Sequence, residues 1–137
     1  MPSPGGSGRI ITEGLAFLPF GTGATSLVNG ASRYLYAGGP SLATAMSQAQ
    51  RPIARRGTLK NLFVYHGTTG GGAVTYRVYV NGVDTGIIAT VNGGGTDASD
   101  TTNTYDVVPG DLVALEATSG GVAPSGVHAQ LEMERRS

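Results

Sequence analysis

The stretch from Gly57 to Glu116 alternates short apolar runs with turn residues almost without interruption, and this pattern constrains the fold more than any other feature. Runs such as 74–80 (VTYRVYV) and 112–117 (LVALEA) are separated by glycine-rich or Pro-Gly-Asp segments. Short β-branched and aromatic runs between turn signals are typical of strands in a sandwich or barrel. The chain is therefore predicted to be all-β.

Two segments alternate cleanly, and the second does so cleanly enough to assign an inward and an outward face. In 73–80 the valines and Tyr76 fall on one face, and Asn81-Gly82 favours a type I′ turn into a returning strand at 87–91. The last strand is predicted at 126–134, where His128, Gln130, Glu132 and Glu134 alternate with Val127, Ala129, Leu131 and Met133.

The remaining strands are predicted from shorter patterns. The segment 58–66 has apolar groups on both predicted faces: Leu59, Asn61, Phe63 and Tyr65 share one, and Lys60, Leu62, Val64 and His66 share the other. We therefore expect it to be covered on both sides, either inside a sandwich or at a subunit contact. The segment 42–53 suits a helix by composition, but its period near two favours a strand. Further strands are expected at 9–20, 27–36 (a hairpin around Asn29-Gly30), 102–108 and 112–118, with a loop at 96–106.

The chain is expected to form one domain. Its 137 residues suit a single core. Residues 1–8 are Pro, Gly and Ser apart from Met1, so they are predicted to be a flexible N-terminal arm, either frayed or ordered only on a neighbouring subunit. Residues 9–137 are predicted to be a single-domain, jelly-roll-like β-sandwich.

Composition disfavours several partners and compartments. Nine Lys and Arg balance nine Asp and Glu, whereas nucleic-acid binding requires clustered positive charge. No apolar run approaches the length that spans a bilayer, and the first residues lack the apolar core of a signal peptide. There is no cysteine for a disulfide or a thiolate site. We expect no nucleic-acid or membrane partner and assembly in the cytoplasm.

Few residues suggest chemistry. His66 and His128 are interpreted as surface or rim histidines, because a zinc site would need both together with carboxylates. Asp97, Asp100 and Asp106 suggest either a calcium loop or ordinary turn chemistry, which explains them well enough. Neither glycine triplet precedes Lys-Ser/Thr as a phosphate loop does. No catalytic residue, cofactor site or metal site is assigned, and the chain is not expected to be an enzyme.

Arginines supply the candidate partner contacts. Arg51, Arg55 and Arg56 form a basic cluster, and Arg9 follows the N-terminal arm. These residues are either solvated loop charges or a docking surface for an acidic subunit. Nucleic acid is disfavoured because no aromatic platform is interleaved with them.

Residues 57 to about 134 resemble a known family. The matching segments are GTLKNLFV, TYRVYVNGVDTG, IIATV, NTYDVV, PGDLVALEA and VHAQLEME, which together span somewhat more than half of the chain. They resemble the small jelly-roll, tumour-necrosis-factor-like β-sandwich domains of tailed-phage virion proteins, which include capsid decoration proteins and tail or fibre tips. Spore-surface and complement-like trimeric heads share the same strand pattern. The resemblance implies a homotrimer with one strand-rich face along the three-fold axis.

Three functions follow from these observations. The first is a bacteriophage virion structural protein of the capsid decoration or cement type, which binds the assembled shell of major capsid protein and stabilises it. The alternative is a tail-fibre or other appendage tip that binds a receptor or a glycan, although the chain has no tryptophan to stack on a sugar. The third is a small β-sandwich hydrolase or isomerase, disfavoured because no acid-base pair can be assembled.

Overall fold

The structure is a computed structural model, and it describes residues 15–22, 27, 30–37, 42–121 and 123–135. Within this part the chain forms 11 strands and one helical turn of four residues. The predicted arm at 1–8, Arg9 and the first half of the strand predicted at 9–20 lie outside the described residues. No helix in the part that the structure covers is long and apolar enough to cross a bilayer.

The elements follow one another with short connections. Their bounds, in chain order, are β2 (Leu15–Gly21), β3 (Ser32–Ala37), β4 (Leu42–Ala43), α1 (Met46–Ala49), β5 (Arg51–Pro52), β6 (Gly57–His66), β7 (Val74–Val80), β8 (Val83–Val91), β9 (Asp97–Asp100), β10 (Tyr105–Val107), β11 (Leu112–Ser119) and β12 (Val127–Arg135).

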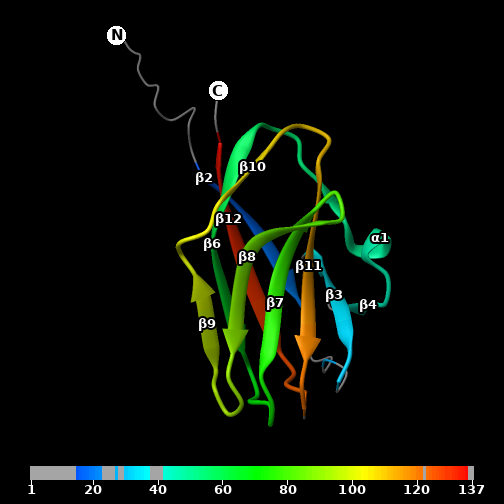
Figure 1. The fold of residues 1–137 in the computed structure, drawn as a ribbon, viewed down its shortest axis with the longest axis vertical. Helices are drawn as coiled ribbons and strands as arrows, with labels where there is room; N and C mark the ends of the chain where they lie inside the picture. Colours follow the sequence, from blue (N-terminus) through cyan, green and yellow to red (C-terminus); the bar gives the residue numbers. More distant parts are fainter. Residues whose placement is uncertain (1–14, 23–26, 28–29, 38–41, 122, 136–137) are drawn as a thin grey trace.

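The strands form two antiparallel layers (Figure 1). The first sheet has the order β6–β12–β2, with β9 and β10 both pairing with β6 on its other side. The second sheet has the order β3–β11–β7–β8, and β4 and β5 add to β3 and β11. The two layers join through two residue pairs between β2 and β3. The last strand lies between the first described strand and β6, so the connections cross between layers as they do in a jelly roll. The predicted all-β, jelly-roll fold is confirmed.

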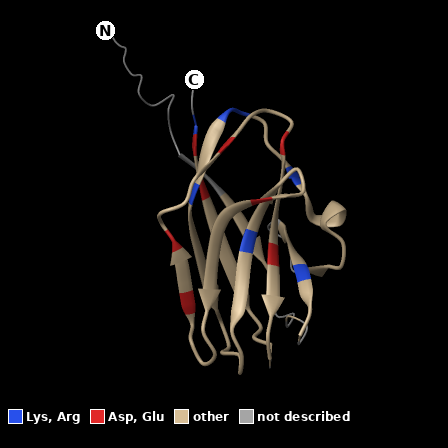
Figure 2. Ribbon diagram, viewed as in Figure 1, with Lys and Arg blue, Asp and Glu red and all other residues tan. Residues whose placement is uncertain are grey.

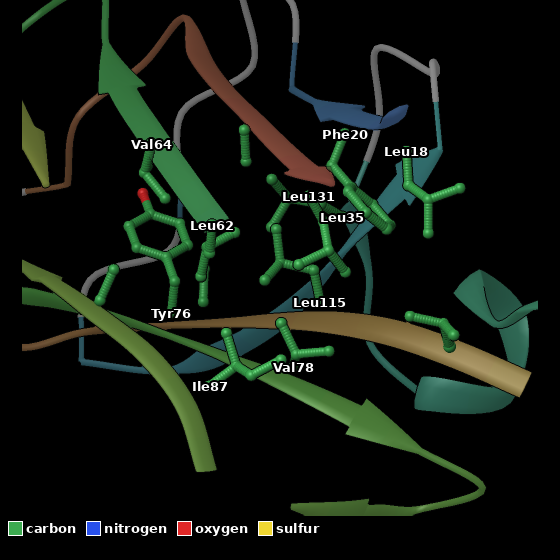
Figure 3. Close-up of a cluster of buried hydrophobic side chains, with 14 of the residues drawn as sticks. Leu18, Phe20, Leu35, Leu62, Val64, Tyr76, Val78, Ile87, Leu115 and Leu131 are labelled. Atoms are coloured by element: carbon green, nitrogen blue, oxygen red, sulfur yellow. The ribbon is translucent and has the colours of Figure 1, made fainter. Parts of the chain in front are cut away.

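The core fills the space between the two layers. The predicted inward residues of β12 are buried, and so are Val74, Tyr76, Val78 and Val80, which the sequence placed on one face of β7. Ile87, Ala89 and Val91 of β8 and Val113, Leu115 and Ala117 of β11 join them. Figure 3 shows ten core side chains meeting from both sheets: Leu18, Phe20, Leu35, Leu62, Val64, Tyr76, Val78, Ile87, Leu115 and Leu131. Residues two apart on a strand share a face, so the apolar side chains that alternate in the sequence lie together on the buried face.

β6 contains a bulge at Asn61. Its register with β12 moves from the pair Leu62–Leu131 to the pair Lys60–Glu132, so Asn61 is left without a partner position. The backbone of Asn61 has a φ of +50°, in the left-handed region that Asn tolerates better than most residues. A bulge inserts one extra residue and reverses the facing of the side chains that precede it.

The faces predicted for 58–66 are wrong, because the bulge reverses the facing of the residues before Asn61. Leu59 and Leu62 are both fully buried in the core, although an uninterrupted alternation would place them on opposite sides. Phe63 and Tyr65 lie on the outward face and are about half exposed, so the expectation that both faces of this strand are covered is wrong for this chain taken alone. The bulge allows one strand to supply a leucine-rich inner face along its whole length and an aromatic outer face at one end.

The prediction of a continuous strand over 42–53 is also wrong in the middle of that segment. The segment contains two-residue strands at its ends, with the α1 turn (Met46–Ala49) between them. A single turn has few backbone hydrogen bonds, and Ala49 anchors it by packing into the interior. The period near two that favoured a strand came from alternating small residues, which carry little information about facing.

Two other predictions need correction. The loop predicted over 96–106 contains β9 (Asp97–Asp100), which pairs with β6, while the strand predicted over 102–108 is limited to β10 (Tyr105–Val107). Leu27 is not in a strand, and its amide donates to the carbonyl of Pro124 at 3.0 Å, so the first arm of the hairpin predicted at 27–36 is absent there. Residues 28–29 of that hairpin lie outside the described residues.

Three glycine-rich loops close one end of the sandwich, at the bottom of Figure 1. We call this the glycine-rich end, formed by 67–73, 92–96 and 120–126 as far as these are described. Gly94 N donates to Gly70 O at 2.8 Å, and Gly120 N donates to Ala73 O at 2.9 Å. A Cβ on Gly72 would lie 2.8 Å from the nitrogen of Gly121, so only glycine allows these backbones to meet.

Candidate functional site

One row of outward side chains crosses the first sheet near the glycine-rich end. The antiparallel register places Tyr65 of β6 between Asp97 of β9 and His128 of β12. Directly opposed residues of antiparallel strands share a face and have Cβ atoms about 5 Å apart, so these three side chains are neighbours. Gly21 of β2 continues the row without a side chain, and Tyr36 of β3 opposes Gly21 in turn.

A second row runs parallel to the first and crosses β6 two residues earlier, at Phe63. Phe63 lies between Ser99 of β9 and Gln130 of β12, and Gln130 is opposed in turn by Pro19 of β2. Phe63 and Tyr65 are 52% and 53% exposed, and their Cα atoms are about 7 Å apart along the strand. Two large aromatic side chains are thus held side by side on the surface by a sheet that is anchored in the core.

The two rows surround an open groove of about 520 Å³. Val64 and Ala129 also line it, and because their side chains point into the core they contribute backbone to its floor. A space of this size is in the range that accommodates a small ligand. We call it the aromatic groove and define it by its outward side chains Phe63, Tyr65, Asp97, Ser99, His128 and Gln130.

The polar side chains of the aromatic groove have few partners. Tyr65, His128 and Gln130 make no side-chain hydrogen bond with any residue that the structure describes. Asp97 accepts one, from the hydroxyl of Thr96 at 3.2 Å. The groove therefore offers a phenol, an imidazole and an amide to water or to a ligand, together with a carboxylate that accepts one hydrogen bond from the protein.

The aromatic groove is poor in charge. Asp97 is the single charged residue of its lining, which has neither Lys nor Arg. The adjoining glycine-rich end has no charged residue in its described loops, and Figure 2 shows that end uncoloured. The electrostatic field at this site is therefore weak, with one negative group at one edge.

The arginines predicted as partner contacts lie at the opposite end of the sandwich. Arg55 and Arg56 are exposed in the loop between β5 and β6, and Arg51 is partly buried in β5, where it pairs with Val113. Arg9 lies outside the described residues. Figure 2 shows blue and red ribbon gathered toward this end, near the C-terminus. We call it the charged end, formed by the loops β5–β6, β7–β8 and β10–β11.

The loop that carries these arginines has a rigid base. Ile53 is buried, its amide donates to Asp111 O, and its carbonyl accepts from the amide of Gly110, both at 2.8 Å. A hollow of about 250 Å³ lies beside the loop, lined by Arg56, Gly57, Asp106, Val107 and Val108. The structure thus brings Arg56 next to Asp106 and Val107 of β10 and to Val108, which follows that strand.

The two histidines lie on opposite sides of the first sheet. His66 is fully buried, and its Nε2 lies 2.6 Å from the hydroxyl of Tyr76 on β7, which joins the two layers. Burial lowers the pKa of His66 and raises the pKa of Tyr76, so both groups are neutral near pH 7. The surface interpretation is wrong for His66 and correct for His128, which is exposed in the aromatic groove.

One carboxylate of the predicted acidic loop, Asp100, makes the backbone contacts expected of turn chemistry. Asp100 is buried and accepts hydrogen bonds from the amides of Ile88, Thr102 and Asn103 and from the side chain of Asn103, at 2.9 to 3.0 Å. Burial acts to raise the pKa of Asp100, but these hydrogen bonds outweigh it and lower the pKa. Among the described residues, no group of three or more His, Cys, Asp or Glu side chains is placed to hold a metal ion.

The sequence predicted part of the arrangement of side chains in the aromatic groove. Alternation already placed Phe63 with Tyr65 on one face of their strand, and His128 with Gln130 on one face of theirs. It gave no sign that the two strands are adjacent, because 60 residues separate them and the order of strands in a jelly roll is not sequential. The contribution of Asp97 and Ser99 was missed because β9 was predicted to be a loop.

Comparison with known proteins adds little to this description. No protein-family model matches the sequence, and no curated protein matches it. One solved structure with a similar fold is the native structure of a family 35 carbohydrate binding module from Clostridium thermocellum, at a TM-score of 0.46 and 14% identity over 89% of this chain and 92% of that chain. At this level of similarity, no property of that module is carried over to this chain.

Proposed function

We propose that the protein is a non-enzymatic structural protein of a tailed-phage virion, a capsid decoration protein that binds the assembled shell as a homotrimer. The sequence resemblance over residues 57 to about 134 supports this assignment. A jelly-roll sandwich whose end loops are hydrogen-bonded to one another suits a role as a rigid clamp. The observation that carries the proposal is the exposed Arg55–Arg56 loop on its hydrogen-bonded base at the charged end.

The charged end has the composition of a docking surface. Val83 and Val108 are 57% and 48% exposed at this end, and Val108 lines the hollow beside Arg56. Exposed apolar side chains supply the buried area of a protein contact, and arginine supplies bidentate hydrogen bonds to carboxylates on a partner. This end suits an acidic patch on the major capsid protein.

The stabilising mechanism is mass action. A ligand that binds only the assembled shell shifts the equilibrium toward that shell, by an amount that grows with its free concentration relative to Kd. In a homotrimer, three copies of the charged end engage neighbouring shell subunits together, so individually weak contacts sum to a strong one. Binding should weaken with added salt, because exposed ion pairs are screened.

Co-sedimentation with assembled shells of the phage that encodes the chain tests this function. The double variant Arg55→Glu/Arg56→Glu should bind the shell at least about tenfold more weakly, since it reverses the charges that face the acidic patch. Arg33→Glu makes the same kind of change on β3 of the second sheet and should bind like the unmodified protein. Failure of the unmodified protein to sediment with shells, or equal binding by all three proteins, would contradict the proposal.

A further inference from the structure

We propose that the aromatic groove is a binding site for a short, uncharged oligosaccharide. This inference goes beyond the shell-binding function and does not depend on it, because the groove and the arginine loop lie at opposite ends of β6. Six residues separate Gly57 from Phe63 on that strand, which corresponds to roughly 20 Å. The proposal gives a definite site to the glycan-binding alternative that the sequence left open.

The aromatic pair supplies the first half of the recognition. The face of an aromatic ring is electronegative, and the C–H groups on one face of a sugar ring are weakly electropositive, so the two attract when stacked. Phe63 and Tyr65 lie next to each other and half exposed on a strand whose inner face is locked in the core. Little conformational entropy is therefore lost when a ligand orders them.

The polar partners supply the second half. Tyr65 has His128 on one side and Asp97 on the other, while Phe63 lies between Gln130 and Ser99. Each aromatic ring is thus flanked by groups that donate or accept hydrogen bonds. A sugar hydroxyl is both a donor and an acceptor, so adjacent hydroxyls match an amide, a carboxylate or an imidazole placed beside a stacked ring.

Charge excludes an anionic ligand as the preferred occupant. The lining has no Lys or Arg to pair with a sulfate, phosphate or carboxylate, and its one charge, Asp97, would repel them. The uncharged loops of the glycine-rich end give no compensating attraction. An uncharged ligand is not repelled by Asp97, so this field does not weaken its binding.

Hydrogen bonding excludes a dry contact with a second copy of the chain. An apolar partner surface would bury Tyr65 Oη, His128 and Gln130 without partners, and each unpaired group costs about 1 to 3 kcal/mol. A saccharide brings its own hydroxyls to these groups. The groove also lies open across the strands, and the span from Ser99 on β9 to Pro19 on β2 is about 14 Å, which fits a chain better than a single ring.

A glycan array that contains neutral and acidic glycans tests the ligand class. The expected result is binding to neutral glycans, followed by saturable binding of one or more of maltotriose, cellotriose and chitotriose in calorimetric titrations of the full chain. Sialyllactose and a heparin-derived disaccharide should bind more weakly. No neutral glycan bound, or only the anionic probes bound, would overturn the proposal.

Paired variants locate the site. Phe63→Ala and Tyr65→Ala should each weaken binding of the trisaccharide about tenfold or more, the loss expected for one stacked ring. Tyr79→Ala removes a tyrosine from the second sheet and should leave binding unchanged. Equal binding by all variants would overturn the assignment. So would dissociation of an oligomer by Phe63→Ala or Tyr65→Ala, which would make the face an interface between copies.

The outcome can be separated from that of the shell-binding function. Tyr65→Ala should keep shell binding, and Arg55→Glu/Arg56→Glu should keep trisaccharide binding, since each changes a different surface. Loss of both activities in either variant would contradict the separation of the two sites. A thermal melt of each variant checks that the fold survives the substitution.

Discussion

The outer faces of the two sheets differ in how their polar side chains are used. On the second sheet, cross-strand neighbours bond to one another. The hydroxyls of Ser32 and Thr118 are 2.8 Å apart, and Glu116 accepts from Tyr34 at 3.4 Å and from Tyr79 at 3.2 Å. Among the described residues of the first sheet, such pairs join Thr58 to Asp106 and Asn61 to Glu132, in the half toward the charged end. Its other half is the aromatic groove, where Tyr65, His128 and Gln130 have no partner in the described chain.

This difference indicates what each face can do. A face whose donors and acceptors already pair with one another gains little from a ligand, because any new hydrogen bond replaces an existing one. A face that holds unpaired polar groups between exposed rings gains both hydrogen bonds and apolar contact. The second sheet is therefore a stabilising face, and the aromatic groove of the first sheet is a face available for binding.

The largest expected effect comes from a charge at the position that the bulge turns toward the core. Leu59 is fully buried because of the bulge, whereas an uninterrupted alternation would place residue 59 at the surface. Leu59→Asp should therefore destabilise the fold by at least about 3 kcal/mol, or prevent folding, because it removes a buried leucine and buries a carboxylate. Urea unfolding followed by circular dichroism measures this loss.

Asn61→Gly is the matched control for that substitution, because it changes the bulge residue and keeps its backbone conformation. Glycine adopts a φ of +50° without strain, and the substitution removes only the hydrogen bond that Asn61 donates to Glu132 at 3.0 Å. Its free energy of unfolding should stay within about 1 kcal/mol of that of the unmodified protein. Equal stability of Leu59→Asp and Asn61→Gly would show that residue 59 does not face the core.

A smaller effect should separate the two outer faces. Glu116→Ala removes the acceptor shared by Tyr34 and Tyr79 on the second sheet and should destabilise the protein by about 1 to 2 kcal/mol. Gln130→Ala on the first sheet breaks no bond and should change stability by less than about 0.5 kcal/mol. Chemical denaturation midpoints at constant m value compare them, and an equal loss in both variants would remove the distinction between the faces.

The smallest effect should appear in the pH dependence of stability. Burial lowers the pKa of His66 in the folded state, so the unfolded chain binds more protons than the folded chain once pH falls below the ordinary value of 6.5. The free energy of unfolding should therefore fall as pH drops below about 6.5 and be fully retained above it. Unfolding curves between pH 8 and pH 5 measure this trend.

Two variants assign that trend to its source. The double variant His66→Leu/Tyr76→Phe removes both partners of the buried hydrogen bond and should flatten the dependence over this range. His128→Ala changes an exposed histidine and should leave it as it is. The contribution of Asp100 lies lower, because its depressed pKa makes its stabilisation disappear only as pH falls below 3.8. An unchanged slope in the double variant would contradict the assignment.

The sequence predicted those parts of the fold that depend on local pattern. Alternation predicted both β7 and β12 and which of their side chains share a face, because a period of two is fixed by backbone geometry. For β12 it also predicted which face is buried. The turn at Asn81-Gly82 was predicted for the same kind of reason, and both residues have positive φ. The jelly-roll class followed from the number and spacing of such strands.

The errors lie where tertiary contacts override local pattern. The facing of Leu59 depends on a bulge that no local signal marks, and β9 is polar enough to read as a loop although its pairing with β6 orders it. His66 was predicted at the surface because the apolar layer that covers it comes from the other sheet. The aromatic groove joins β9, β6, β12 and β2, and strand order across a jelly roll is set by the packing of the whole chain.

The copy number of the protein in purified virions tests the central claim, that this jelly roll is a homotrimeric capsid decoration protein, most directly. Quantitative mass spectrometry of intact particles, referenced to the major capsid protein, measures it. The account predicts a number that is a multiple of three and matches the three-fold or quasi-three-fold sites of the shell. Absence of the chain from intact particles, or only a handful of copies per particle as expected for a tail component, would contradict it.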